Sequence, residues 1–138
     1  RYGTMKYVLD TTAFSAAMRR EPGLLTILKG YRPGDIVTVP PVVAEIQFGI
    51  KRLNNSSKKC LLLKAERDRL LSVISVLPWL PESSVSFGKI KADLEREGKL
   101  IDDFDIAIAA IAISHKCGVA TSNSNRFQRI KGLEIKSW

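Results

Sequence analysis

The chain has 138 residues, of which 45% are hydrophobic and 26% are charged. These values are typical of one globular domain and exclude disordered and fibrous proteins. No apolar run approaches the roughly 18 residues that a membrane span needs, so we expect no membrane association. The 22 Lys and Arg residues outnumber the 14 Asp and Glu residues, and the net charge of +8 favours a polyanionic partner such as nucleic acid.

The cysteines and the first residues set two further expectations. Cys60 and Cys117 lie far apart and show no CxxC or Cys/His spacing, which argues against a zinc site or a disulfide scaffold and favours a reducing cytoplasm. Residues 1–4 precede Met5 and resemble a cloning remnant, and no leader peptide is expected. The sequence therefore predicts a single domain over residues 5–138.

The first half of the chain alternates between strand and helix signals. Short runs rich in β-branched and aromatic residues predict buried strands at 6–9 and 36–39. Two short helices are expected between them, at 13–20 and from Pro22, because proline suits the first helical turn. A further helix is expected from Pro41 to about residue 53.

The second half continues the alternation. Its expected elements are a helix capped by Ser57 and running to about Ser75, a helix from Pro81 to Glu97 ended by Gly98, an apolar helix capped by Asp102 and closing at Gly118, and strands at 119–121 and 133–135. Strands separated by helices predict a parallel sheet covered on both faces. In such a sheet, ligands bind beyond the carboxyl ends of the strands.

Three acids occupy positions that are unusual for acids. Asp10 directly follows the first expected strand, where it could either cap a helix or belong to a site. Glu45 has Val42 and Phe48 at helical spacing, which places it in an apolar stripe unless it lies on the surface. Asp105 opens the apolar run 106–113, although favourable interaction with the helix N-terminus would also account for it.

A fourth polar position follows the strand expected at 119–121. Asn123 lies in the polar stretch 121–125, for which an ordinary turn is the alternative. Together Asp10, Glu45, Asp105 and Asn123 would make an oxygen-rich cage of the kind that Mg²⁺ or Mn²⁺ prefers.

The order of these segments resembles that of the PIN-domain nucleases, in particular the VapC toxins of bacterial type II toxin–antitoxin pairs. The resemblance extends from Met5 to Trp138, and the matching segments are 7–11, 40–49, 98–101, 104–110, 121–123 with Phe127, and 132–138. It implies a three-layer α/β/α sandwich with a central parallel sheet, and a metal-dependent endoribonuclease toxin that works with Mg²⁺ or Mn²⁺ on RNA. It also implies a homodimer that a small antitoxin protein inhibits.

The resemblance assigns Asp10, Glu45 and Asp105 to the acidic cluster, as catalytic and metal-binding residues. Asn123 falls at the fourth position, where an acid is usual, and is expected to be a weaker ligand. Arg126 stands where another acid is sometimes found, so the expected site has fewer negative charges than the fullest form of the pattern. A catalytically weakened PIN-like module that binds RNA or protein is therefore the alternative function, and a nuclease acting on DNA is a third.

Hydroxyl and basic side chains complete the expected site. Thr11, Thr121 and Ser122 are expected to orient carboxylates or water, and Arg126 and Arg129 to contact an RNA backbone. His115 lies near the end of an apolar helix and is a poor candidate for a general base. The resemblance carries most of the expectation of a dimer. The sequence adds a set of apolar residues in the first helical pair that one small helical hairpin would not hide, although core packing is the alternative; they are Phe14, Met18, Leu24, Leu25 and Leu28.

Overall fold

The computed structural model describes residues 5–138, so the expected cloning remnant at 1–4 lies outside the described residues. A five-stranded parallel sheet has the strand order β3-β2-β1-β4-β5. The strands are β1 (Tyr7–Leu9), β2 (Ile36–Thr38), β3 (Ser75–Val76), β4 (Gly118–Ala120) and β5 (Ile135–Lys136).

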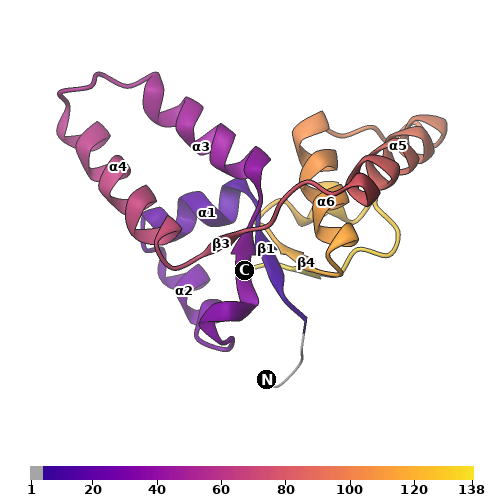
Figure 1. Ribbon diagram of the computed structural model, residues 1–138, viewed down its shortest axis with the longest axis horizontal. Helices are drawn as coiled ribbons and strands as arrows, with labels where there is room; N and C mark the ends of the chain where they lie inside the picture. The colour runs from indigo at the N-terminus through magenta and orange to yellow at the C-terminus, as the bar shows by residue number, and fades with distance from the viewer. Residues whose placement is uncertain (1–4) are drawn as a thin grey trace.

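Helices cover both sides of this sheet. They are α1 (Thr11–Met18), α2 (Pro22–Leu28), α3 (Pro40–Lys51), α4 (Lys58–Leu71), α5 (Pro81–Arg96), α6 (Asp103–Ser114) and α7 (Ser124–Phe127). Helices α1 to α4 lie on one side of the strands, and α5 and α6 lie on the other (Figure 1). The predicted α/β sandwich with a parallel sheet is confirmed.

Helix ends follow the local signals that the sequence carries. The Ser57 hydroxyl accepts a hydrogen bond from the Cys60 N–H at 3.0 Å, and Asp102 accepts one from the Phe104 N–H at 2.7 Å, so both act as N-caps. Gly98 follows α5 with φ +65, a conformation that glycine adopts without strain. These caps fix where α4, α5 and α6 begin or end.

Two predicted helix ends are wrong by four residues, and the last strand, expected at 133–135, is Ile135–Lys136. The helix expected to reach Ser75 ends at Leu71, and residues 75–76 form the edge strand β3. Here pairing with β2 overrides helical spacing, since the Leu77 N–H donates to the Thr38 carbonyl at 2.9 Å. The helix expected to close at Gly118 ends at Ser114, and Gly118 instead begins β4.

Gly118 is needed for close packing rather than for helix termination. A Cβ at this position would lie 2.6 Å from the Tyr7 ring and 2.9 Å from the Glu134 carbonyl oxygen. No real side-chain carbon tolerates such distances, so only glycine lets β4 pair closely with β1 and β5.

Most apolar residues of the first helical pair lie in the core. Phe14, Met18 and Leu24 are buried, whereas Leu25 and Leu28 are partly buried. Leu28 packs against the core, so this pair leaves less apolar surface exposed than the sequence suggests, and the dimer stays a prediction.

The apolar helix α6 is buried as predicted, and its N-terminus reaches the edge of the sheet. Ile106, Ile108 and Ile111 are fully buried, which fixes the axis of the helix and the direction in which its first turn points. Within residues 5–138, no helix has the length and apolarity needed to cross a bilayer.

Candidate metal and nucleic-acid site

The carboxyl ends of β1 and β4 place two of the expected site segments side by side. Leu9 pairs with Ala120 in the parallel ladder, and the Asp10 N–H donates to the Ala120 carbonyl at 3.1 Å. Asp10 and Thr121 are therefore the first residues beyond two adjacent strands. These two residues are 111 positions apart in the chain, and they meet at one sheet edge because the strands are parallel and adjacent.

Asp10 is a buried acid, with 2% of its surface exposed. Its Oδ1 accepts hydrogen bonds from the Thr12 hydroxyl at 2.6 Å and from the Ala13 N–H at 2.9 Å, which also makes it the N-cap of α1. Burial raises the pKa of Asp10 above 3.8; hydrogen bonds from Thr12, Thr121 and Ala13 oppose the shift, and the charge of Asp105 adds to it. Asp10 therefore caps α1 and is also an acid whose charged form is disfavoured by burial.

Glu45 extends from α3 toward the same edge. The Thr11 hydroxyl donates a hydrogen bond to Glu45 Oε1, which joins the start of α1 to α3. Glu45 is partly buried, and Val42 on the same helix is buried. Phe48, however, is 65% exposed, so the expected apolar stripe around Glu45 is wrong at that position.

The three acids at the start of α6 have three different environments. Asp102 caps the helix, and Asp103 forms an ion pair with Lys91 at 3.0 Å. Asp105 turns toward the sheet edge, where its Oδ2 accepts a hydrogen bond from Arg126 Nη1 at 2.9 Å. The helix terminus therefore accounts for Asp102 but not for the placement of Asp105.

Thr12, which sequence reasoning did not select, links the two strand ends. Its hydroxyl donates to Asp10 and accepts a hydrogen bond from the Ser122 N–H at 3.0 Å. The available signal was its position two residues after an acid that ends a strand. The hydroxyl of Thr121 accepts from the Asn123 N–H at 2.8 Å, so these hydroxyls and amides fix the loop that carries Asn123.

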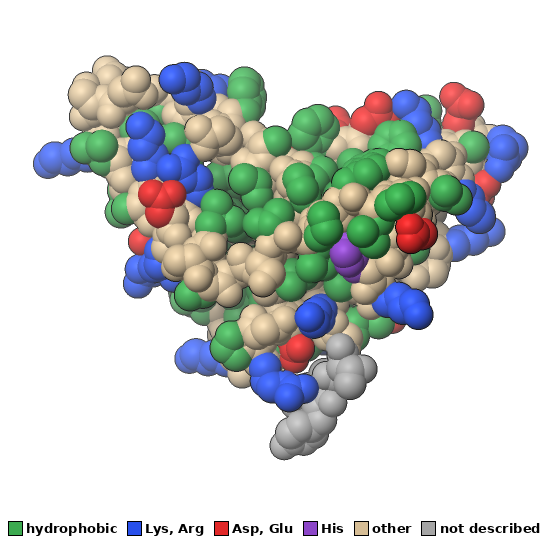
Figure 2. Space-filling model, viewed as in Figure 1, with side chains coloured by type: hydrophobic (Ala, Val, Ile, Leu, Met, Phe, Trp, Pro, Cys, Tyr) green, Lys and Arg blue, Asp and Glu red, His purple; other side chains and the backbone are tan. Residues whose placement is uncertain are grey.

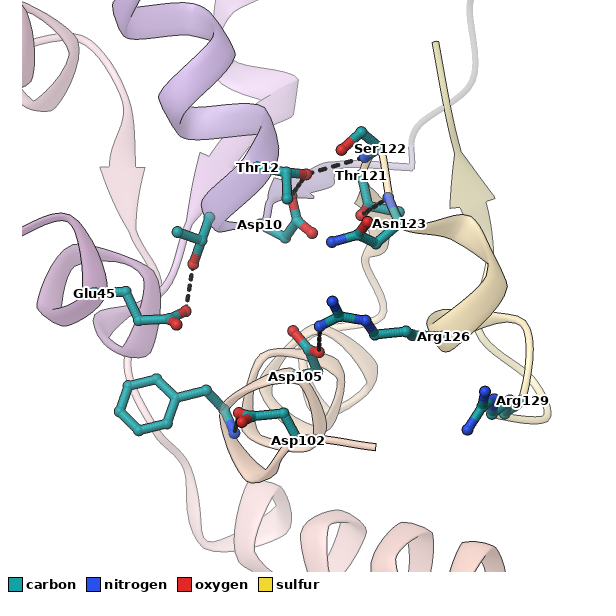
Figure 3. Close-up of polar contacts among 12 residues, drawn as sticks. Asp10, Thr12, Glu45, Asp102, Asp105, Thr121, Ser122, Asn123, Arg126 and Arg129 are labelled. Atoms are coloured by element: carbon teal, nitrogen blue, oxygen red, sulfur yellow. Dashed lines mark hydrogen bonds and ion pairs between the residues drawn. The ribbon is translucent and has the colours of Figure 1, made fainter. Parts of the chain in front are cut away.

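The expected acids surround one region without touching. Figure 3 shows Asp10, Glu45 and Asp105 entering it from three different elements, with Asn123 beside Asp10 and Arg126 reaching toward Asp105. Within residues 5–138, no three Asp, Glu, His or Cys side chains come close enough together to hold a metal ion as they stand. Thr11 engages Glu45 and Arg126 engages Asp105, so each carboxylate has a separate protein partner.

Arg129 lies farther from the acids and has a structural contact. Its Nη1 donates to the carbonyl oxygens of Lys99 and Leu100, both at 3.2 Å. This contact joins the segment after α7 to the loop before α6. Its guanidinium borders a polar hollow of about 430 Å³ that is lined by Gly98, Lys99, Asn125, Gln128 and Arg129.

The donor set suits a hard divalent cation. Carboxylate, amide and hydroxyl oxygens line the region, and Mg²⁺ and Mn²⁺ bind such oxygens whereas Zn²⁺ favours Cys and His. His115, the one histidine of the chain, contacts the Pro78 carbonyl at 2.9 Å through Nε2. The chemistry of the ligands therefore fits magnesium or manganese, once Asp105 is released from Arg126.

A family model described as "PIN domain" matches residues 7–133. The chain belongs to the PIN-domain family. The matched range contains every acid of the sheet edge together with α7, so the whole candidate site lies inside the PIN domain.

Two curated relatives of this PIN domain match along nearly their whole length. Ribonuclease VapC2 of Haemophilus influenzae (strain ATCC 51907 / DSM 11121 / KW20 / Rd) is 30% identical over 136 residues, which cover 97% of this chain and 98% of that protein. Ribonuclease VapC1 of Rickettsia felis (strain ATCC VR-1525 / URRWXCal2) is 32% identical over 133 residues, with 95% of each chain covered.

Solved structures give the same result for the fold. "VapBC2 from Rickettsia felis bound to a DNA fragment from their promoter" superposes with a TM-score of 0.82 and 27% identity, covering 97% of this chain and 99% of the other. "FitAB bound to IR36 DNA fragment" gives 0.83 and 25%, covering 95% and 94%. The PIN fold thus extends over almost the entire chain.

Proposed function

We propose that this PIN domain is a divalent-metal-dependent endoribonuclease and the toxin of a type II toxin–antitoxin pair. The observation that carries the proposal is Asp10: a buried carboxylate with a raised pKa beside a second acid, Asp105, at the carboxyl edge of a parallel sheet. Among residues 5–138, the ion pairs do not include Asp10. A cation from solution would offset the unfavourable burial of its charge.

Asp10, Glu45 and Asp105 are the proposed catalytic and metal-binding residues, and the amide oxygen of Asn123 is a weaker ligand. A bound Mg²⁺ or Mn²⁺ supplies charge screening at the phosphodiester and a lower pKa for the attacking water. Thr11 orients Glu45 through its hydrogen bond, while Thr121 and Ser122 position the loop of Asn123. These contacts hold the ligands at the edge before any substrate arrives.

RNA is the proposed substrate. Both relatives described above carry the name ribonuclease, and the net charge of +8 favours a polyanion. Arg126 and Arg129 lie on the α7 side of the acids, where they can contact the phosphate backbone without selecting a sequence.

A cleavage assay with matched oligonucleotides tests this function. Purified protein should cut RNA with Mg²⁺ or Mn²⁺, and chelator or Asp10→Asn should abolish cutting, while DNA of the same sequence should remain intact. Cutting that resists chelator would reject the metal mechanism, and cutting of DNA alone would reject the ribonuclease. RNA binding without cleavage under all metal conditions would instead establish the weakened module.

An antitoxin protein is the proposed inhibitor, and a groove beside the site suits it. The groove has a volume of about 440 Å³ and is bordered by Thr11, Glu45 and Phe48 together with the basic residues Arg19 and Arg52. Phe48 is exposed in the lining of this groove, and two leucines of α4, Leu61 and Leu62, are exposed as well. A bound segment there would reach Thr11 and Glu45 and obstruct the acids. Expression without a partner should arrest growth, and co-expression of the antitoxin should restore it.

A homodimer is also proposed, through the face formed by β3 and the start of α5. Figure 2 shows hydrophobic side chains gathered from β3 across to α5; the large exposed residues of this stretch are Val73, Val76, Trp79 and Val85. Val85 is 74% exposed, and β3 is an edge strand, features that favour association. Light scattering should give twice the monomer mass for the parent protein and the mass of a single monomer for Val85→Lys.

We further propose that residues 5–138 form one domain in the cytoplasm. One apolar core connects the strands with α1, α3, α5 and α6, and both cysteines, Cys60 and Cys117, are free thiols as is usual in a reducing compartment. Limited proteolysis should leave one resistant core, and fractionation should recover the protein with cytoplasmic markers.

A further inference from the structure

We propose that Arg126 is a built-in counterion that exchanges with the divalent metal: it holds Asp105 when the metal is absent and turns to the RNA phosphate when the metal binds. This inference rests on the proposed function, since it concerns the same acids. It adds a positioning residue and an order of events that the acids alone do not supply.

The contact has the geometry of a releasable pair. Arg126 Nη1 lies 2.9 Å from Asp105 Oδ2, and the side chain of Asp105 is 15% exposed while that of Arg126 is 49% exposed. The carboxylate is therefore held by α6, whereas the guanidinium can turn into solvent without moving the backbone. Its neighbour Phe127 is fully buried and anchors α7.

The charges around Arg126 explain why it lies there. The charge of Asp105 contributes to the raised pKa of Asp10, so the two carboxylates repel each other across the sheet edge. A guanidinium beside Asp105 weakens that repulsion, and so would a divalent ion between the acids. Both cations use the same carboxylate, which makes their binding competitive.

Arg126 also extends into the region that the proposed site residues surround. Figure 3 shows its side chain extending from α7 toward Asp105, on the side of that acid that faces Asn123. Once a metal holds Asp105, the freed guanidinium has a planar set of donors next to the metal and can bind a phosphate bidentately. The same side chain would thus weaken metal binding and strengthen RNA binding.

Calorimetric titration with Mn²⁺ tests the exchange. Arg126→Gln should bind Mn²⁺ roughly fivefold more tightly, the upper range for an ion pair of this exposure, and Arg126→Glu more tightly still. Without metal both variants should melt at a lower temperature than the parent protein, and Mn²⁺ should raise their melting temperatures by more. Lys131→Gln and Lys131→Glu are matched controls, because Lys131 is an exposed cation close to α7 in the chain and the same charge changes there should alter Mn²⁺ affinity little.

Two further measurements separate the exchange from its alternatives. In an Asp105→Asn background, Arg126→Gln should no longer alter Mn²⁺ affinity, because the competing carboxylate is gone. At saturating Mn²⁺, Arg126→Gln should raise the KM for RNA severalfold and lower kcat less.

Each outcome decides a specific claim. Equal or weaker Mn²⁺ binding by Arg126→Gln, or an equal gain in Lys131→Gln, would overturn the exchange while leaving the nuclease intact. An unchanged KM would overturn the phosphate contact. Failure of the parent protein and both Arg126 variants to bind Mn²⁺ would overturn the proposed metal site and this inference together.

Discussion

Two carboxylates in this molecule, Glu66 on α4 and Asp10 at the sheet edge, show opposite responses to their surroundings. Glu66 is bonded by Arg20 at 3.0 Å and by Arg69 at 2.8 Å, and these two guanidinium groups lower its pKa to about 2. Asp10 is buried with neutral donors and an acidic neighbour, and its pKa is raised. Two arginines thus neutralise the charge of Glu66, whereas Asp10 forms no ion pair within residues 5–138.

The difference separates structural charge from functional charge. Glu66 needs no partner from solution, because Arg20 and Arg69 both donate hydrogen bonds to it and neutralise its charge. Asp10 has its hydrogen bonds but forms no ion pair with any residue of the described part of the chain, and Asp105 has a half-exposed counterion, Arg126. An incomplete pair of acids at a strand edge is the feature on which the proposed metal site depends.

The largest expected effect comes from Asp10→Asn. The asparagine can still accept hydrogen bonds from Thr12 and the Ala13 N–H, so α1 should keep its cap. Cleavage of RNA should nevertheless fall on the order of 100-fold or more, because the ligand charge is lost. Initial rates at saturating Mn²⁺ and far-ultraviolet circular dichroism measure both; an active variant with an intact fold would contradict the role of Asp10.

Replacing the other two acids tests the rest of the cluster. Glu45→Gln keeps an oxygen that Thr11 can bond, and Asp105→Asn keeps one for Arg126, so both variants should fold. Each should lose roughly 10-fold to 100-fold of the cleavage rate. Matching losses in Mn²⁺ affinity would support direct binding, and full activity in either variant would remove that acid from the centre.

The pH dependence of the melting temperature should distinguish Asp10 from Glu66. A raised pKa in the folded state means that Asp10 favours folding most below its unfolded value of 3.8, and that this contribution is lost as pH rises through the folded pKa. Without metal, Asp10→Asn should therefore melt above the parent protein at pH 7 and approach it near pH 4. A constant difference across this range would show that Asp10 is not the titrating group.

How far the sequence predicts this site depends on the residue. Asp10 and Asp105 were identifiable because each is an acid beside a buried apolar run, and such runs set both strand ends and helix starts. The pairing of Arg126 with Asp105 was not, because it depends on α7, a four-residue helix in a stretch with the composition of a turn. Thr12 was missed for a similar reason, since its role as a bridge to Ser122 requires knowledge that β1 and β4 are neighbours.

The same distinction applies to the fold. Proline and serine caps located α4 and α5 within a residue or two of their observed starts, because caps act locally. Strand β3 has two residues, both exposed, and exists through pairing with β2, so no local pattern marks it. The position of Gly118 is likewise set by the ring of Tyr7, a contact between strands.

Adding a negative charge at Asn123 should have the opposite effect on metal binding to removing one at Asp10. Asn123→Asp adds a fourth carboxylate near Asp10, which should raise Mn²⁺ affinity roughly threefold and lower the metal-free melting temperature through repulsion. Titration calorimetry and melting curves in chelator test the two halves. No change in either would place Asn123 outside the site and leave Asp10, Glu45 and Asp105 as its ligands.

The smallest effect is expected at Glu66. Glu66→Gln removes a partly buried charge that Arg20 and Arg69 already neutralise, and solvent and salt screen the interaction because both guanidinium side chains are exposed. RNA cleavage should be unchanged and the melting temperature at pH 7 slightly lower. Because a lowered pKa stabilises the folded state above the ordinary value of 4.5 and this contribution is lost as pH falls through about 2, the difference in melting temperature should shrink with acid. The difference has the opposite sign to that of Asp10→Asn, which melts above the parent protein at pH 7. High salt should also diminish the difference in melting temperature between Glu66→Gln and the parent protein. A loss of cleavage comparable to that of Asp10→Asn would contradict the division between the two acids, since it would give the neutralised charge of Glu66 the function that we assign to Asp10.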